Sequence, residues 1–530
     1  MTFDTIIVGA GSAGCALAGR LSEDPSRTVL LVEAGRHDGG FWSRLPLGVG
    51  RILNDPDRTW LVRTEPSPAT DDIPRDWVSG RCLGGSSAVN GLLYVRGHPE
   101  RYDAWARRSG APWSYGDCLP HFRAIEDWRG PPGPERGRGG PIAVTPADPE
   151  PVSERFLAAC AALGYARSAD YNAVAGIGAS YLQLSTRDGW RCDAARGYLG
   201  PARGRPNLTV LRGASAERVV VEGGRARGVV ARVDGVERAY DARREVVLSA
   251  GAVRSPQLLE LSGIGRPDAL ERAGIAALVP NAHVGEHLQD HLMVRLCFRT
   301  SLPDTVNGML ASYRRLVGEV LRYAFTRRGQ FSSASLKSTL YAASDPARPS
   351  PDLRIQVALV SAINRIPKAI REGLDPGSAF QIGVYGLYPE SSGHVHVATG
   401  SPSDPPRVQP NYLAEPADRT VLLAGLRLAR RIAATAPLAQ AIEGEIRPGV
   451  ACATDDDLLA YARRTGQTCW HPIGTCRMGA PGDGVVDGEC RVHGVGGLRV
   501  VDASVFPLMT SSNTNAPTIM LADRVARAMR

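Results

Sequence analysis

The first 33 residues constrain the fold of this chain more than any other stretch. A glycine-rich run, GAGSAG at residues 9–14, follows the apolar residues 6–8, and Glu33 closes a second apolar run that begins at Thr28. Glycines at this spacing permit a tight strand-to-helix turn, a close approach of the backbone to a pyrophosphate, and close packing of helix on strand. The helix N-terminus then presents free N–H groups and a partial positive charge to the phosphates. The pattern predicts a dinucleotide-binding unit in which the Glu33 carboxylate accepts hydrogen bonds from the ribose hydroxyls.

Length and composition indicate a globular protein with more than one domain. The chain has 530 residues, well beyond the ~250–300 at which a single core stops growing. Its 43% hydrophobic and 22% charged residues are ordinary globular usage. The formal net charge is +8, but the basic residues are scattered and no run of five occurs, so we expect no nucleic-acid partner.

Cysteine usage and hydropathy indicate the compartment. The ten cysteines are spread singly, and no basic and apolar leader precedes the first strand, so we expect a reduced, cytoplasmic protein. No stretch reaches the ~18–20 continuous apolar residues of a membrane span, which predicts no integral membrane segment and leaves peripheral association open.

Two later segments are rich in small residues. Residues 80–91 read GRCLGGSSAVNG, and a predicted strand at 245–248 runs into SAGA at 249–252. Small residues let the backbone lie against a flat ligand, and Ser and Asn offer donors to polar ring edges. We therefore expect both segments to contact a cofactor; the alternative for 80–91 is a tight surface loop.

Periodicity and punctuation predict the remaining elements. Helices are predicted at residues 151–163, 255–261, 313–327 and 518–529. Strands are predicted at residues 208–211, 218–221, 226–233, 245–248, 353–360, 380–387, 394–397 and from 497 onward. The middle of the chain, about 296–455, reads as a second domain in which helices cover one face of a sheet.

The best catalytic candidates lie late in the chain. Residues 470–479, WHPIGTCRMG, place His471 before a proline in a turn, and residues 511–517, SSNTNAP, supply two amides before the last helix. A histidine near neutral pKa can take the proton of an alcohol, and a neighbouring amide can orient the oxygen. The alternative for His471 is a core histidine satisfied by the backbone.

Four segments together resemble the glucose-methanol-choline (GMC) flavoprotein oxidoreductases, most closely the choline-dehydrogenase-like branch. These are GAGSAG with Glu33, GRCLGGSSAVNG, GAVRSPQLLELSGIG, and HPIGTCRMG with the terminal NTNAPTIMLADR. They occur in the family's order and spacing over nearly the whole chain. The resemblance implies an α/β fold: a Rossmann-like FAD-binding domain built from residues 1–150, 192–295 and 456–530, and an α+β substrate domain, an antiparallel sheet with helices on one face, built from 151–191 and 296–455.

The resemblance also implies a site, residue by residue. The FAD-binding residues it indicates are Gly9, Gly11, Ser12, Ala13, Gly14, Glu33, Ala34, Arg81, Gly84, Gly85, Ser86, Asn90, Gly91, Leu92, Ala216, Ala250, Asp502, Ala503 and Asn515. His471 matches the catalytic histidine. Asn513, ten residues before Asp523, falls where the family has a second His or Asn. The implied reaction oxidises an alcohol to an aldehyde or ketone: His471 accepts the hydroxyl proton, Asn513 holds the oxygen, and hydride passes to flavin N5.

Two departures from the family pattern bear on the cofactor and the substrate. Val89 stands where some members attach FAD covalently through a histidine, so we expect non-covalent FAD. Lys337 lies in residues 329–338, where related dehydrogenases often carry an acid. If Lys337 faces the substrate, a neutral or anionic alcohol fits better than choline; the alternative is a surface lysine.

Three histidines have spacing suggestive of a metal site, and Glu286 makes the segment look zincin-like. They are His283, His287 and His291. Gly285 interrupts any helix there, and the segment resembles a structural turn of the family, so we predict no metal.

Two alternatives to alcohol oxidation remain at this level. One is a family offshoot with lyase or decarboxylase chemistry, and the other is a flavin-binding protein without turnover. The expected partners are a small-molecule alcohol and an electron acceptor, either O₂, a quinone or another acceptor.

Overall fold

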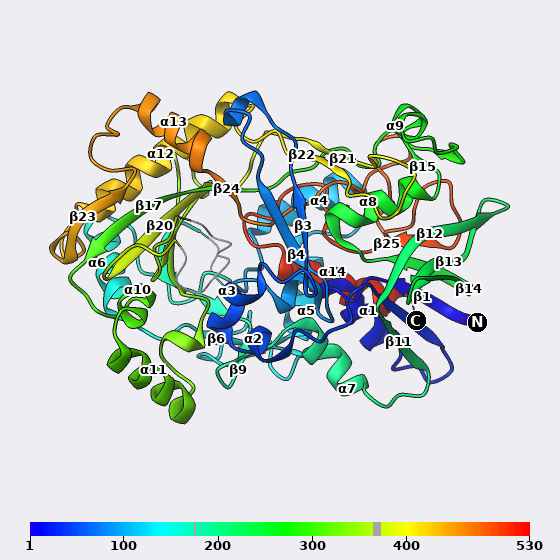
Figure 1. Cartoon of the computed structure of the whole chain (residues 1–530), viewed down its shortest axis with the longest axis horizontal. Helices are drawn as coiled ribbons and strands as arrows, with labels where there is room; N and C mark the ends of the chain where they lie inside the picture. Colours follow the sequence, from blue (N-terminus) through cyan, green and yellow to red (C-terminus); the bar gives the residue numbers. More distant parts are fainter. Residues whose placement is uncertain (174–175, 364–372, 530) are drawn as a thin grey trace.

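The computed structural model describes residues 1–173, 176–363 and 373–529, and it contains two seven-stranded sheets (Figure 1). The strand order of the first sheet is β11-β2-β1-β14-β13-β12, and β25 also pairs with β14. Its strands are β1 (Thr2–Val8), β2 (Val29–Glu33), β11 (Leu208–Arg212), β12 (Ala214–Glu222), β13 (Arg225–Val233), β14 (Val236–Leu248) and β25 (Leu498–Val500).

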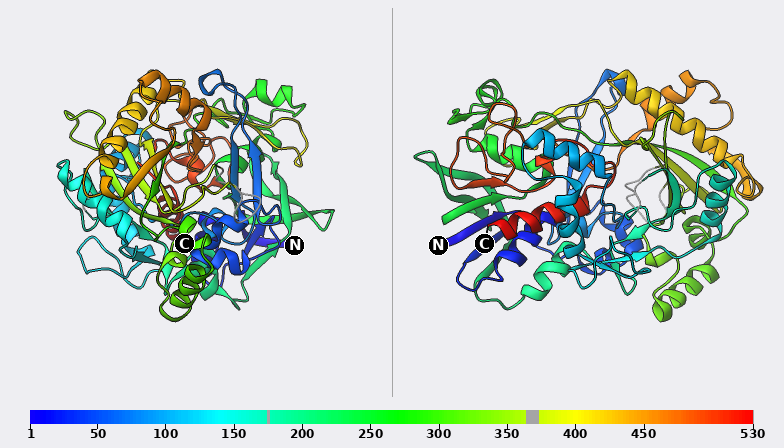
Figure 2. Two further views of the ribbon diagram at one scale, coloured as in Figure 1. Left: turned by 60° about the vertical axis from the view of Figure 1, so that its left-hand side comes forward. Right: turned by 180° about the vertical axis from the view of Figure 1, so that it is seen from behind.

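The first sheet combines a parallel part with an antiparallel part. Strands β11, β2, β1, β14 and β25 pair in parallel, whereas β12, β13 and the first half of β14 form an antiparallel meander. Helix α1 (Ser12–Leu21) is almost wholly buried, as expected for a helix packed on a parallel sheet. The last helix, α14 (Asn515–Ala528), lies beside α1, so the two ends of the chain build one layer (Figure 2, right).

The second sheet is antiparallel throughout, with strand order β23-β17-β20-β19-β18-β7 and β24 beside β17. Helices α6 (Pro151–Ala162), α12 (Pro416–Ala433) and α13 (Asp455–Thr465) pack their apolar residues into one core with one face of this sheet. The strands are β7 (Gly178–Tyr181), β17 (Leu292–Thr300), β18 (Leu336–Ala342), β19 (Leu353–Ala358), β20 (Ala379–Gly386), β23 (Ile442–Arg447) and β24 (Gln467–Thr468).

Shorter elements connect the two sheets. The remaining α-helices are α2 (Gly40–Arg44), α3 (Val49–Ile52), α4 (Pro99–Ser109), α5 (Tyr115–Ile125), α7 (Gly200–Ala202), α8 (Gly251–Leu261), α9 (Pro267–Arg272), α10 (Val306–Leu310) and α11 (Tyr313–Thr326). The small sheets pair β3 (Thr59–Arg63) with β4 (Asp76–Gly80), β6 (Ile142–Pro146) with β5 (Glu126–Trp128) and β8 (Gln183–Leu184), β9 (Thr186–Arg187) with β10 (Trp190–Arg191), β15 (Ile264–Gly265) with β16 (Val279–Pro280), and β21 (His394–His396) with β22 (Arg407–Gln409).

The predicted fold class is confirmed, with corrections to individual elements. Helix α8 begins at residue 251 rather than 255, and Pro256 lies inside it. A proline there leaves the carbonyl four residues earlier without its helical donor. The Thr475 hydroxyl donates to that carbonyl, of Ala252, at 2.7 Å, a contact from a distant segment that sequence reading does not anticipate.

Two further elements differ from the prediction. The last helix begins at Asn515, not 518, because Pro517 lies in its first turn, where no N–H donor is needed. The strand predicted at 394–397 pairs only with β22 and is not part of the second large sheet.

The division into two domains at the predicted residues stays a prediction. The predicted boundary between 295 and 296 falls inside β17, and β24, from the third predicted FAD-binding segment, pairs with β17. None of the helices in the described part of the chain combines the length and apolar character needed to span a bilayer.

Candidate active site

The glycine-rich turn after β1 and the second glycine-rich loop lie directly on each other. Gly9 has φ +98°, and a Cβ there would stand 2.6 Å from the carbonyl oxygen of Ser249. Gly85 has φ +51°, and a Cβ there would stand 2.6 Å from Cα of Gly11. Only glycine satisfies both the left-handed backbone and the close approach. The two loops therefore form one cradle with exposed backbone, as a bound dinucleotide requires.

Glu33 closes the cradle at the end of β2. Its carboxylate accepts hydrogen bonds from the N–H groups of Ala10 at 2.9 Å and Gly35 at 2.8 Å. Burial raises the pKa of Glu33 to about 7, against the opposing effect of these two hydrogen bonds. The carboxylate is thus held at the cavity wall by the turn itself, with lone pairs left for hydroxyl donors.

A large cavity connects the cradle to the second sheet. Its volume is about 1010 Å³, at the upper end of the range for ligand sites and suited to a dinucleotide together with a substrate. His471 and Asn513 line it. So do most of the predicted cofactor residues: Gly9, Gly11, Ser12, Ala13, Glu33, Ala34, Gly85, Ser86, Asn90, Gly91, Ala216, Ala250, Asp502, Ala503 and Asn515.

Four predicted cofactor residues do not line the cavity. Gly14 packs against the Gly9 carbonyl, where no side chain would fit, and Gly84 lies behind the loop. The Arg81 guanidinium stacks on Trp60, 4.3 Å from the ring centroid, and the side chain of Leu92 is buried. These residues shape the cradle from outside.

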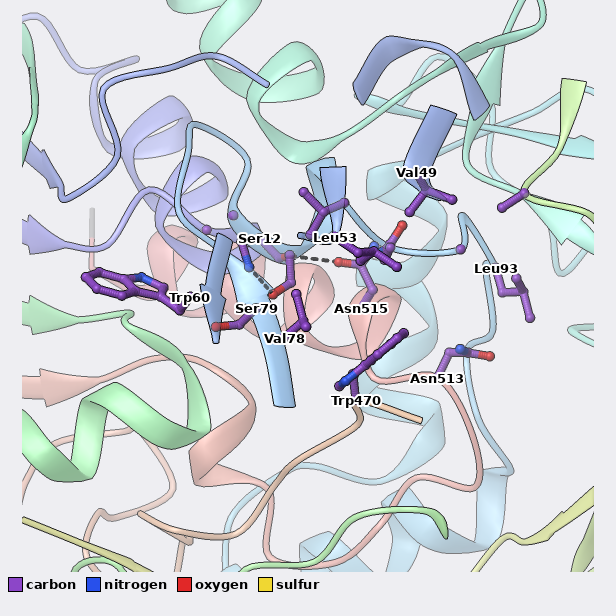
Figure 3. A pocket seen from close by; sticks show the side chains of 18 of the residues that line it. Ser12, Val49, Leu53, Trp60, Val78, Ser79, Leu93, Trp470, Asn513 and Asn515 are labelled. Carbon is purple, nitrogen blue, oxygen red and sulfur yellow. Dashed lines mark hydrogen bonds between the residues drawn. The ribbon is translucent and has the colours of Figure 1, made fainter. Parts of the chain in front are cut away.

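Two helix N-termini meet in the cradle. Ser12, the first residue of α1, donates its hydroxyl hydrogen to the Asn515 side-chain oxygen at 2.7 Å, and Asn515 is the first residue of α14 (Figure 3). Asp502 ties a third helix to the same place, since its carboxylate accepts from the Gly251 N–H and the Ser255 hydroxyl. Converging N–H groups and helix dipoles favour an anionic ligand such as a pyrophosphate.

His471 and Asn513 come together at the other end of the cavity. Nδ2 of Asn513 lies 2.8 Å from Nε2 of His471. The Asp290 carboxylate holds the His471 backbone, because it accepts a hydrogen bond from the His471 N–H at 2.7 Å. It also accepts hydrogen bonds from the hydroxyls of Thr468 and Tyr412. His471 is therefore more than a core histidine satisfied by the backbone, because its ring contacts another side chain at the cavity wall.

His291 fixes the tautomer of His471. The Nδ1 atoms of the two rings are 3.0 Å apart, and Nε2 of His291 lies 3.0 Å from the carbonyl oxygen of Leu387. A carbonyl only accepts, so Nε2 of His291 carries a hydrogen. Burial lowers the pKa of His291 to about 4, so the ring is neutral and its Nδ1 is an acceptor. His471 must then carry its hydrogen on Nδ1, which leaves Nε2 unprotonated and able to accept from the Asn513 amide.

Arg354, on β19, supports Asn513 from behind. Its fully buried guanidinium donates to the Asn513 side-chain oxygen at 2.7 Å, and it also contacts Ser512, Tyr385 and Thr339. An accepting oxygen turned to Arg354 leaves the amide NH₂ of Asn513 facing His471. The sequence carried no signal for Arg354, because its role depends on which face of β19 meets residues 512 and 513.

The histidine-rich segment separates into two parts. His283 and His287 stack with Nδ1 and Nε2 3.0 Å apart, whereas His291 bonds to His471. The three rings therefore do not converge on one point. In the sequence, His291 is a candidate only for a metal site. Its contact with His471 follows from the pairing of β17 with β24.

Lys337 does not face the cavity. It is 2% exposed, so the alternative of a surface lysine is wrong. Its neighbour Leu336 lines the cavity whereas Lys337 does not, and the pairing of β18 with β19 is irregular between Leu336 and Ser338, so simple alternation of side chains does not hold there. Burial lowers its pKa, partly opposed by Asp148 and Glu150. It contributes no contact to a substrate in the cavity.

A parallel sheet whose glycine turn opens on a cavity shared with a second, antiparallel sheet is the architecture of a dinucleotide-dependent oxidoreductase. Family models described as GMC oxidoreductase match residues 3–293 and 389–522. The chain belongs to the GMC oxidoreductase family. It is an FAD-dependent enzyme that acts on CH–OH groups.

Similar proteins cover the whole chain. The oxygen-dependent choline dehydrogenase of Vibrio vulnificus is 35% identical over 99% of this chain and 93% of its own length. The alcohol dehydrogenase [acceptor] of Pseudomonas putida is 35% identical over 99% and 95%. Among solved structures, pyridoxine 4-oxidase from Mesorbium loti is similar with a TM-score of 0.89, 31% identity and 99% coverage of both chains. A formate oxidase from Aspergillus oryzae is similar with a TM-score of 0.91, 25% identity, and 99% and 97% coverage.

Proposed function

We propose that this enzyme oxidises an alcohol to an aldehyde or ketone with His471 as the proton acceptor. The observation that carries the proposal is the tautomer chain from the Leu387 carbonyl through His291 to His471. It leaves an unprotonated Nε2 at the cavity wall, and a general base needs such a lone pair within reach of the hydroxyl.

Asn513 orients the alcohol oxygen in this proposal. One hydrogen of its NH₂ points to Nε2 of His471 at 2.8 Å, and the second is available to the substrate oxygen. Arg354 holds the amide in this orientation and places a positive charge behind it. A buried cation there stabilises the negative charge that develops as the hydroxyl loses its proton.

The predicted FAD site supports non-covalent binding. The cradle accommodates the group, and bound FAD supplies a two-electron acceptor for hydride. Val89, at the position where some family members have a histidine, lines the cavity with an aliphatic side chain that offers no nucleophile. We expect acid precipitation to release the yellow colour into the supernatant; a yellow pellet would argue for a covalent bond.

An anaerobic screen of primary and secondary alcohols tests the reaction. We expect an alcohol to bleach the flavin. Air is then admitted, and afterwards a quinone, and the one that restores the colour identifies the electron acceptor. His471→Ala should slow bleaching by roughly 10²–10⁴ while FAD stays bound. An oxidised flavin with every alcohol, or full-speed bleaching in the variant, would contradict the proposal.

A further inference from the structure

One face of the second sheet forms the wall of the cavity opposite the cradle. Side chains alternate along strands, so residues 292, 294 and 296 of β17 enter the core beneath α12 while Met293 and Arg295 line the cavity. On β20, Gln381, Gly383 and Tyr385 line it in the same way. Alternate residues of neighbouring strands therefore make up this wall.

Arg295 is a buried cation on this wall, and it has no carboxylate partner among the residues that the structure describes. Its side chain is embedded, with the residue only 8% exposed. The described hydrogen bonds of the guanidinium go to neutral oxygens and are long: 3.5 Å to Gln381, 3.2 Å to Gln467 and 3.4 Å to the Ile363 carbonyl. Within the described ranges no carboxylate oxygen lies within 4 Å of it. Burying a charge without a counterion is costly unless a ligand supplies one.

The charged groups around Arg295 do not neutralise it. The nearby carboxylate of Asp375 is bound by Arg447 and the Ser361 hydroxyl. The described acids that line the cavity are Glu33 and Asp502, which belong to the cradle. The described part of the sheet wall therefore carries a net positive charge.

A second polar side chain on this wall is only partly satisfied by the described residues. Gln356, 8% exposed, lines the cavity, and its Oε1 has no hydrogen-bond partner among the described residues. Its Nε2 meets only the Met293 sulfur, at 3.4 Å, a weak acceptor. Gln356 and Arg295 both pair with Gly383, on opposite sides of β20. Gly383 has no side chain, and the Met293 thioether lies over it: a Cβ at Gly383 would stand 2.6 Å from the Met293 sulfur.

We propose that the substrate is an alcohol that carries a carboxylate, which Arg295 binds while the hydroxyl lies at His471. This inference rests on the proposed oxidation at His471 and names the substrate class. Arg295, on β17, lies four residues beyond His291, which directly precedes this strand, roughly 13 Å along the chain. Met293 and Tyr385 line the wall between, so the middle of the substrate is apolar or aromatic.

Matched alcohols test the charge preference directly. The probes are 4-(hydroxymethyl)benzoate, 4-methylbenzyl alcohol and 4-(hydroxymethyl)phenyltrimethylammonium, with a ladder of ω-hydroxyalkanoates against 1-alkanols to cover chain length. We expect the wild type to prefer the carboxylate member of a pair by roughly 10- to 100-fold in kcat/KM, the effect of a hydrogen bond to a charged group. Arg295→Met should abolish that preference, mainly by raising KM for the carboxylate member of each pair.

Two variants control for general damage. Arg295→Lys keeps the charge and should retain part of the preference. Arg299→Met removes an exposed arginine from the same strand and should change nothing. Calorimetry with 4-methylbenzoate, which has no hydroxyl to oxidise, should show binding that the Arg295→Met variant loses.

The outcomes separate the two proposals. Equal or better oxidation of the neutral or cationic members, unchanged by Arg295→Met, would overturn the carboxylate inference and leave alcohol oxidation intact. Absence of oxidation for every probe while 4-methylbenzoate still binds through Arg295 would overturn the proposed function and not the anion site.

Discussion

At the residue scale, the chemistry depends on which nitrogen of His471 carries a hydrogen. The Leu387 carbonyl at one end can only accept and the Arg354 guanidinium at the other can only donate, so every hydrogen bond between them has one direction. His291 is a positioning residue in this chain, since it acts on His471 and not on the substrate. Such a chain selects the reactive tautomer before substrate binds.

Substitution of His291 tests this role. His291→Leu removes the acceptor of the Nδ1 hydrogen, so the base is no longer held in one tautomer and a buried donor is left unpaired, at a cost of about 1–3 kcal/mol. We expect flavin reduction by alcohol to slow by roughly 10- to 100-fold with little change in KM. His291→Asn offers an amide oxygen instead and should recover much of the rate. Equal rates in the Leu variant and the wild type would remove His291 from the mechanism.

At the element scale, two loops and three helix N-termini build the cofactor cradle. The turn after β1 and the loop at 80–91 touch backbone to backbone at Gly11 and Gly85. Helices α1, α8 and α14 begin around them and are tied by Ser12 and Asp502. The cradle therefore depends on close contact between backbone segments. A side chain at these positions would push the segments apart.

Gly85→Ala tests the loop contact. Alanine at φ +51° is strained by about 1–2 kcal/mol, and its Cβ would displace the Gly11 backbone. We expect FAD affinity to fall by roughly tenfold or more, measured as the ratio of flavin to protein absorbance after dialysis. Gly318→Ala, at an exposed position of α11 with open space around it, is the matched control. Full flavin retention in the Gly85 variant would mean that the loops do not need this contact.

At the scale of the whole molecule, His396 joins β21 to helix α8, which follows β14 of the first sheet. Its ring lies between two carboxylates, 2.7 Å from Glu260 of α8 and 3.1 Å from Glu286. Burial alone would lower the pKa of His396, but hydrogen bonds and charge interactions with the two acids raise it to about 9. A doubly donating imidazolium therefore links segments that are more than a hundred residues apart.

This link predicts a pH-dependent stability. Because the folded pKa, about 9, exceeds the ordinary value near 6.5, the contribution is fully present below pH 6.5 and is lost as pH rises through 9. It amounts to at most about 3 kcal/mol. The difference in unfolding free energy between wild type and His396→Gln should shrink between pH 6.5 and 9.5 in denaturant titrations. A difference independent of pH would show that His396 is not charged in the folded state.

The sequence by itself determined the features that are read locally along the chain. Two features predicted the fold class and a cofactor cradle: the glycine spacing with Glu33, and the family's order of segments ending in His471 and Asn513. The structure brings most of those residues to one cavity. Only the tertiary structure decided the roles of His291, Arg354 and Arg295. Their chemistry depends on strand register and on which face of the second sheet meets the cavity, and such contacts between distant segments leave no pattern in neighbouring residues.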